Sequence, residues 1–202
     1  MAFVYALTVM AVMFNILGFW FYNRDAFLRG GTRPNGASSF LWAINTLVNA
    51  GSYYGMHVPW PTLAVIATDT TLCVVTFAFL LFAERFGRLT GKNYFVAFLC
   101  IVAIFLWKFR SAEDGNLLAQ VPMILSFVPL MQDARAGKTK EDPRAWLSWI
   151  ISFIFNFFIV CLTSKDRIQP FAYPIVAIVM HGILFHYAQE QRRFGVKDFL
   201  KI

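Results

Sequence analysis

Apolar residues occur along the chain in long runs, separated by short segments rich in charged and turn-forming residues. A run of roughly 17–25 apolar residues is long enough for a helix to cross the hydrocarbon core of a bilayer. We therefore predict seven membrane spans, of which the fourth and fifth are short: Ala2–Tyr22, Phe40–Met56, Thr62–Ala83, Tyr94–Trp107, Leu117–Met131, Trp146–Leu162 and Pro170–Tyr187. The pattern indicates an all-α membrane protein.

The composition supports this interpretation. Of the 202 residues, 58% are hydrophobic and only 14% are charged, and the mean hydropathy is +0.58. Soluble domains are typically about one quarter charged, so this chain has too little polar surface to cover a soluble globule. Cys73, Cys100 and Cys161 fall within predicted spans without paired spacing, and they predict neither a disulfide framework nor a metal site.

The 18 basic residues are distributed unevenly between the two sides of the predicted bundle. Only Lys108, Arg110, Lys165 and Arg167 lie on the side of the N-terminus. Basic residues favour the cytoplasmic side, so we predict an outside N-terminus and a cytoplasmic C-terminus, in a bacterial inner membrane or a plasma membrane. The net charge of +7 is then an orientation signal and does not predict a nucleic-acid partner. The other fourteen basic residues are Arg24, Arg29, Arg33, Arg85, Arg88, Lys92, Arg135, Lys138, Lys140, Arg144, Arg192, Arg193, Lys197 and Lys201.

One loop-to-helix passage occurs twice in the chain. The residues that recur, each 107 positions later, are Thr32, Trp42 and Asn49 in the first copy and Thr139, Trp149 and Asn156 in the second. Both copies enter the membrane in the same direction, which predicts two parallel repeats. We expect a 3+1+3 order, with three-helix repeats at 1–83 and 111–190, a linker loop and helix at 84–110, and a cytoplasmic tail at 191–202. Transporters built from such repeats bind their substrate at the interface between them.

Short motifs in the repeats resemble those of a known family. The second copy contains Pro129-Leu130-Met131-Gln132 followed by Lys138-Thr139-Lys140, and the first contains Thr32-Arg33 and then Ser39. With its 3+1+3 order and outside N-terminus, the chain resembles the SWEET sugar transporters and the wider PQ-loop superfamily.

The resemblance implies a function as well as a fold. It implies transport of a small polar solute, a sugar or another small metabolite, by alternating access between two three-helix bundles with Pro129 as a hinge. KDEL receptors use a related fold to bind peptides, so a receptor or binding protein without transport is the alternative. The expected partners are a small-molecule substrate and the lipid bilayer, and homo-oligomer formation stays open.

Asp69 is the only Asp, Glu, Lys or Arg within a predicted span. A charged residue at bilayer depth costs at least about 2.5–3.5 kcal/mol, so it usually faces a cavity or a partner. In the SWEET repeat an asparagine at about this place contacts the substrate, and the resemblance puts His181 at the matching point of the seventh span. We expect Asp69 and His181 to face one cavity as a substrate-binding or proton-relay pair, or else to fasten the bundles together. An aspartate in place of asparagine favours a cationic or proton-linked cargo.

Polar stripes mark the second and sixth spans. Spacings of three or four residues place each set on one helical face: Trp42, Asn45, Asn49 and Ser52, and then Trp149, Ser152 and Asn156. Such residues either line a pathway or form hydrogen bonds across helices, and both interpretations stay open. The resemblance places the family's aromatic shelf at Tyr53 or Tyr54. The G-x-x-x-G spacing of Gly51 and Gly55 predicts a close helix contact.

Catalytic motifs are not recognisable in the sequence. There is no H-E-x-x-H motif or paired aspartate motif, and the last predicted span lacks the lysine that a retinal protein needs. We therefore predict a protein that is not an enzyme and that has no catalytic residues, no cofactor and no bound metal.

Overall fold

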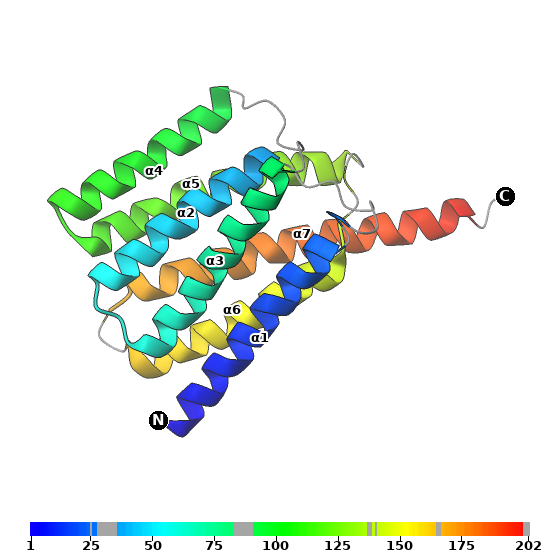
Figure 1. Ribbon diagram of the computed structural model, residues 1–202. Coiled ribbons are helices and arrows are strands. Elements are labelled where there is room, and N and C mark those ends of the chain that lie inside the picture. The colour runs from blue at the N-terminus through cyan, green and yellow to red at the C-terminus, as the bar shows by residue number, and fades with distance from the viewer. Residues whose placement is uncertain are drawn as a thin grey trace.

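The computed structural model describes residues 1–24, 26–27, 36–82, 91–136, 139, 141–164 and 167–199, with the side chains of 37, 92 and 192–199 left out. Within these ranges the chain forms seven α-helices and no β-strand (Figure 1). The helices are α1 (Ala2–Arg24), α2 (Gly36–Gly55), α3 (Trp60–Phe82), α4 (Gly91–Phe109), α5 (Ala112–Arg135), α6 (Pro143–Thr163) and α7 (Gln169–Phe199).

Five of these helices, α1, α3, α5, α6 and α7, are long and apolar enough to cross a membrane. In α4 the apolar stretch Asn93–Phe109 is shorter, and α2 carries buried polar residues along its length. The prediction of an all-α fold is therefore confirmed for the described residues. The five long apolar helices support a membrane protein, whereas α2 and α4 stay predicted spans.

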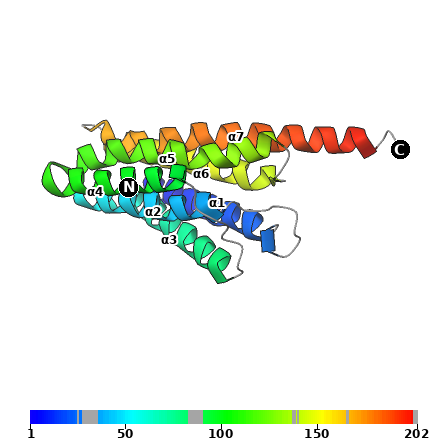
Figure 2. The same ribbon diagram turned by 90° about the horizontal axis from the view of Figure 1, so that it is seen from above.

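Several helices extend beyond the predicted spans because their end turns are polar. The fifth span, predicted as Leu117–Met131, is part of a helix that begins at Ala112 and ends at Arg135. Ser111 caps this helix by accepting a hydrogen bond from the backbone N–H of Asp114 at 3.0 Å. Acidic residues in the first turn interact favourably with the helix dipole, although they lower the local hydropathy. In the same way α7 continues to Phe199 and extends past the other helices, so the predicted tail is largely helical (Figure 2).

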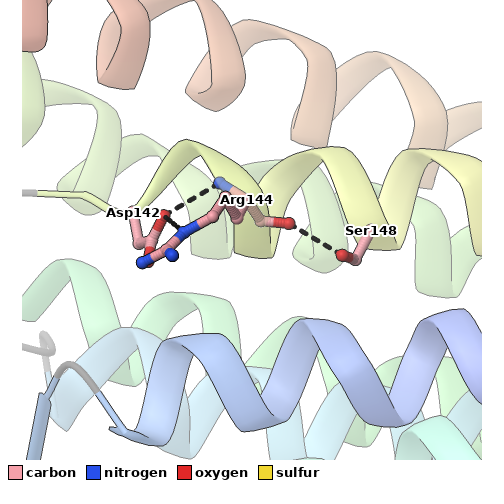
Figure 3. Close-up of polar contacts among 3 residues, drawn as sticks. All are labelled: Asp142, Arg144 and Ser148. Carbon is pink, nitrogen blue, oxygen red and sulfur yellow. Dashed lines mark hydrogen bonds and ion pairs between the residues drawn. The ribbon is translucent and has the colours of Figure 1, made fainter.

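The start of α6 shows how a polar residue defines a helix end. Asp142 accepts a hydrogen bond from the backbone N–H of Arg144 at 2.9 Å, so its carboxylate caps the helix (Figure 3). The guanidinium of Arg144 also folds back onto Asp142, with Nη2 2.6 Å from Oδ2. Proline at the first position of the helix costs no hydrogen bond there. This cap lies in the second copy of the repeated passage. In that passage Thr32, Arg33, Lys138 and Lys140 lie outside the described residues, whereas Thr139 is described and buried.

Successive helices alternate in direction, so the N-terminus and the end of α7 lie at opposite ends of the bundle (Figure 1). Helix α3 packs against both α1 and α2, and α7 packs against both α5 and α6. Across the middle of the molecule, α1 packs against α6 and α2 packs against α5, while α4 covers α5 and α2. We call the two ends the Arg167 end, where α2 connects to α3 and α6 to α7, and the Arg144 end, where α6 begins.

Glycines allow two of these helix contacts to be close. A Cβ atom on Gly18 of α1 would lie 2.6 Å from Nε1 of Trp149 in α6. A Cβ atom on Gly51 or Gly55 of α2 would lie 2.9 Å or 2.6 Å from the indole of Trp107 in α4. The close contact predicted from the G-x-x-x-G spacing is thus confirmed, with α4 as the partner helix.

Candidate functional site

A small cavity lies between the helices near the centre of the molecule. Its volume is about 30 Å³, which is room for about two water molecules. Six helices contribute to its wall, all except α4: Phe19 from α1, Trp42, Asn45 and Thr46 from α2, Asp69 and Cys73 from α3, Met123 and Phe127 from α5, Trp149 from α6, and Tyr173 and His181 from α7.

Asp69 provides the carboxylate of the cavity wall. Its side chain is 5% exposed. Oδ1 accepts a hydrogen bond from Nδ2 of Asn15 at 3.1 Å, and Oδ2 accepts a short hydrogen bond from the hydroxyl of Tyr173. Both donors are neutral, and Asp69 forms no ion pair with any part of the chain that the structure describes. The neighbouring hydroxyls of Thr68 and Thr71 donate to carbonyls of their own helix instead.

His181 lies in the same wall but is not bonded to Asp69. Its Nδ1 is 2.6 Å from the carbonyl oxygen of Ala177, one turn earlier in α7. Because a carbonyl can only accept, Nδ1 carries a hydrogen there. Tyr173, Ala177 and His181 are four residues apart, which places them on one face of α7. Four aromatic rings surround the imidazole, with centroid distances of 5.2–5.5 Å: Phe127, Trp146, Trp149 and Phe153.

The two repeated tryptophans both line the cavity. Trp149 is buried and meets Phe19 edge to face, with ring centroids 5.0 Å apart. Trp42 is tilted against Phe127 at 5.1 Å. Rings from α1, α2, α5 and α6 therefore form most of the apolar wall.

The predicted polar stripe of α2 is divided between two environments. Asn45 lines the cavity, but Asn49 does not. Oδ1 of Asn49 instead accepts hydrogen bonds from Gln120 at 2.8 Å and Asn116 at 3.3 Å, and Asn116 also donates to Ser52 at 3.0 Å. These amides join α2 to α5, so Asn49 forms contacts across helices in this structure, and its predicted place on a transport path stays a prediction.

Asn156, the repeat partner of Asn49, is also absent from the cavity wall. It is fully buried in α6, and within the described residues neither atom of its amide group has a hydrogen-bond partner. In the same stripe, the hydroxyl of Ser152 donates to the carbonyl oxygen of Ala11 at 2.8 Å and so joins α6 to α1.

Neither candidate for the aromatic shelf lines the cavity. Tyr54 is 70% exposed on the outer surface of α2. Tyr53 is buried, and its hydroxyl donates to the carbonyl oxygen of Pro170 at 2.6 Å. Pro174 lies four residues after Pro170 in α7 and has no N–H to donate to that carbonyl. Tyr53 therefore supplies the hydrogen bond that the proline removes, which is a structural role.

Pro129, the predicted hinge, lies inside α5, which continues past it to Arg135. It lines a separate apolar groove of about 360 Å³ between α2, α4 and α5 and not the central cavity. Its position leaves the hinge prediction untested.

Contacts between the two sets of helices also occur at both ends of the bundle. At the Arg167 end, Nη1 of Arg167 donates to the carbonyl oxygen of Met56 at 2.5 Å, and the hydroxyls of Thr62 and Thr163 are 3.3 Å apart. At the Arg144 end, the guanidinium of Arg144 lies over the ring of Phe21 at 5.1 Å. The two sets of helices are thus joined both at the central cavity and toward each end of the bundle.

Several residues of the site were not predicted from the sequence. Asn15 and Tyr173, which hold the carboxylate, lie 54 and 104 positions from Asp69 along the chain. Asn15 is the one side-chain amide between Ala2 and Tyr22, which is a signal that could have identified it. Tyr173 and the rings of Phe19 and Phe127 have no such signal, because aromatic residues are frequent throughout this sequence.

The site offers a buried acceptor group, a few hydroxyl and amide groups and a largely aromatic wall. No group of three or more His, Cys, Asp or Glu side chains that could hold a metal occurs in the described ranges. Comparison of the chain with family models, curated proteins and solved structures found no match in any of the three. The resemblance to the SWEET and PQ-loop proteins therefore stays a prediction from the residues.

Proposed function

We propose that this protein is a membrane transporter of a small polar solute that works by alternating access. In this proposal α1–α3 and α5–α7 are parallel repeats and α4 is the linker helix, as in the SWEET and PQ-loop proteins that the sequence resembles. The solute binds in the central cavity, and rocking of the two bundles opens it to one side and then to the other.

The helix contacts support the repeat. Helices α3 and α7 are each the middle helix of three, and α1 on α6 mirrors α5 on α2. Exchanging the first three helices for the last three therefore leaves these contacts unchanged, whereas the contact of α3 with α6 and the contacts of α4 have no counterpart of similar extent. Trp42 and Trp149, which are equivalent in the repeat, line the same cavity.

One observation carries the proposal: Asp69 from α3 and His181 from α7 line a single cavity between the bundles, which also contact each other toward both ends. A carboxylate is costly to bury in a membrane, and such residues commonly mark substrate or ion pathways. The cavity is lined by α3 and α7, the middle helices of the two bundles. Transporters built from repeats bind their cargo at such an interface between the repeats.

Transport can be tested with purified protein in liposomes. We expect at least one member of a panel of labelled sugars, amino acids, amines and vitamins to accumulate by exchange against the same unlabelled solute. Asp69→Asn keeps the shape of the side chain and should abolish this uptake while leaving the thermal unfolding temperature near that of the wild type. Thr71→Val is the matched control on α3, because the hydroxyl of Thr71 bonds only its own helix. Uptake that is unchanged in Asp69→Asn would contradict the proposal.

The alternative is a receptor or binding protein without transport. The close contact of Gly18 with Trp149 and the small volume of the cavity favour it, because both describe an interface that must separate widely to pass a solute. A solute that stabilises the folded protein but never crosses the liposome membrane would support this alternative, since a ligand that binds the folded state raises its apparent stability.

We further propose that the N-terminus faces outside and that the Arg144 end is cytoplasmic. Arg24 at the end of α1, Arg135 at the end of α5 and Arg144 at the start of α6 belong to one end of the bundle, and Lys108, Arg110 and Arg167 belong to the other. With the loop residues of the sequence included, the Arg144 end carries most of the basic residues, which favours the cytoplasmic side.

A further inference from the structure

We propose that the central cavity is selective for a small organic cation, an amine or a methylated ammonium, with its charge at Asp69 and its carbon atoms against the aromatic wall. This inference rests on the proposed function in taking the cavity as the cargo site. It does not depend on whether the cargo is also transported.

The charge of the site favours a cation. Two neutral donors, Asn15 and Tyr173, each bond one oxygen of the Asp69 carboxylate. An ionised carboxylate has about four lone-pair sites, so about half of its acceptor capacity stays open. No Lys or Arg lies within any predicted span, and within the described chain no ion pair compensates this carboxylate. A bound cation would supply the missing charge.

Aromatic rings make up much of the rest of the cavity wall. The rings of Phe19, Trp42, Phe127 and Trp149 line the same cavity as Asp69. Aromatic faces attract ammonium groups within about 6 Å, and rings gathered around one cavity are a recurrent way to bind methylated ammonium. An acidic group combined with aromatic rings thus fits a cation that also has an apolar surface.

Several polar groups of the cavity wall already have hydrogen-bond partners within the protein. The hydroxyl of Tyr173 is already used by Asp69, and the hydroxyl of Thr46 donates to the carbonyl oxygen of Ala43. Nδ1 of His181 is held by Ala177. A sugar has many hydroxyl groups, and burial without partners costs free energy for each of them. Within the described residues the indole N–H groups of Trp42 and Trp149 have no partner, but two donors are too few for the hydroxyl groups of a sugar. The wall therefore suits a ligand with one charge and few hydrogen-bonding groups.

The volume of the cavity sets the size of the cation. Space for about two water molecules fits methylammonium, which has two non-hydrogen atoms, without movement of the wall. Larger cations such as tetramethylammonium or choline require the bundles to separate. We expect affinity to decrease along this series at equal charge.

The test is ligand-dependent thermal stabilisation of the purified full-length protein at constant ionic strength. The probes are the chloride salts of methylammonium, dimethylammonium, tetramethylammonium and choline, with 3,3-dimethylbutan-1-ol as the neutral isostere of choline. We expect the cations to raise the unfolding temperature in a saturable manner and the neutral alcohol to leave it unchanged. Asp69→Asn should weaken cation binding by at least about tenfold, since it removes the charge that faces the cation, whereas Thr71→Val should bind as the wild type does.

A second pair of variants keeps the proposal testable if Asp69→Asn fails to fold. Trp42→Phe retains an aromatic face and should keep most of the affinity, whereas Trp42→Leu should lose several-fold of it. Equal stabilisation by choline and its neutral isostere, or equal affinity of the two Trp42 variants, would overturn the inference. Liposome uptake of a neutral solute without cation binding would refute cation selectivity and would still support transport. Cation binding without any uptake would refute transport and would still support cation selectivity of the cavity.

Discussion

At the scale of single residues, the polar side chains of this bundle are held by partners on distant helices. Asp69 depends on Asn15 and Tyr173, and Asn49 depends on Asn116 and Gln120. In a bilayer no water is present to replace a missing partner, so every such bond also fixes how two helices pack. The buried tyrosines illustrate the difference between a structural hydrogen bond and one at the site.

Tyr173→Phe and Tyr53→Phe form a matched pair of tests. Each change removes one buried hydroxyl and leaves one acceptor without its donor, the Asp69 carboxylate or the Pro170 carbonyl. We expect each to lower the free energy of unfolding by about 1–3 kcal/mol. Only Tyr173→Phe should also change the affinity for methylammonium, because Tyr53 lies outside the cavity wall. Parallel unfolding and binding titrations check this, and an effect of Tyr53→Phe on affinity would contradict it.

At this scale the sequence could predict only those site residues that are unusual for their position in the chain. Asp69 stands out as a charge within an apolar run, and Trp42 and Trp149 stand out through the repeat. The role of Tyr53 could not be predicted, because it depends on which carbonyl Pro174 leaves open and which helix packs there. The division of the stripe between Asn45 and Asn49 likewise depends on the rotation of α2 against α5, which spacing within α2 does not determine.

At the scale of helices, the runs of apolar residues predicted where each helix lies. Polar capping residues determine where α5 and α6 begin. Ser111 and Asp142 begin α5 and α6 in segments that hydropathy assigns to loops. Packing between helices depends on a different property, the size of the residue at each crossing. Gly18 lets α1 approach Trp149, and this crossing brings Phe19 into the cavity wall.

Gly18→Ala should therefore disturb the molecule far more than the same change at Gly182. The new Cβ would lie 2.6 Å from Trp149 at Gly18, whereas at Gly182 it would meet no described atom within 4 Å beyond its chain neighbours and its own helix backbone. We expect Gly18→Ala to lower the free energy of unfolding by about 1–3 kcal/mol through overpacking. Gly182→Ala should be neutral or stabilising by up to about 1 kcal/mol, since alanine favours helix more than glycine. Thermal unfolding in detergent compares the two, and equal effects would show that the α1–α6 contact is not tight.

At the scale of the whole molecule, different kinds of contact join the two bundles at their two ends. Hydrogen bonds join them at the Arg167 end, and aromatic and cation–π contacts join them at the Arg144 end. If the bundles rock against each other, each set of contacts must break in turn. Weakening one end should therefore expose the cavity from that end.

Cys73 is a native reporter of such opening, because it is buried in the cavity wall. In a variant with Cys100 and Cys161 replaced by alanine, Arg167→Ala removes the hydrogen bond to Met56 and the 3.7 Å ion pair with Glu113. The loss of one such bond, worth about 0.5–1.5 kcal/mol, should raise the rate of Cys73 modification by methyl methanethiosulfonate about two- to tenfold. Arg110→Ala is the control, since Arg110 is highly exposed and pairs with Asp114 one turn away. Equal rates in both variants would mean that the Arg167 contacts do not close the cavity.

The orientation of the molecule gives the last prediction. Lys108 and Arg135 are both exposed and lie near opposite ends of the bundle, at the end of α4 and the end of α5. In a background without native cysteines, Lys108→Cys should react with a membrane-impermeant maleimide in intact cells, because the basic residues favour a cytoplasmic Arg144 end. Arg135→Cys should react only after the cells are permeabilised, which also controls for expression and exposure of both cysteines. Labelling of Arg135→Cys in intact cells would reverse the orientation, and labelling of both sites from outside would mean that α5 does not cross the membrane.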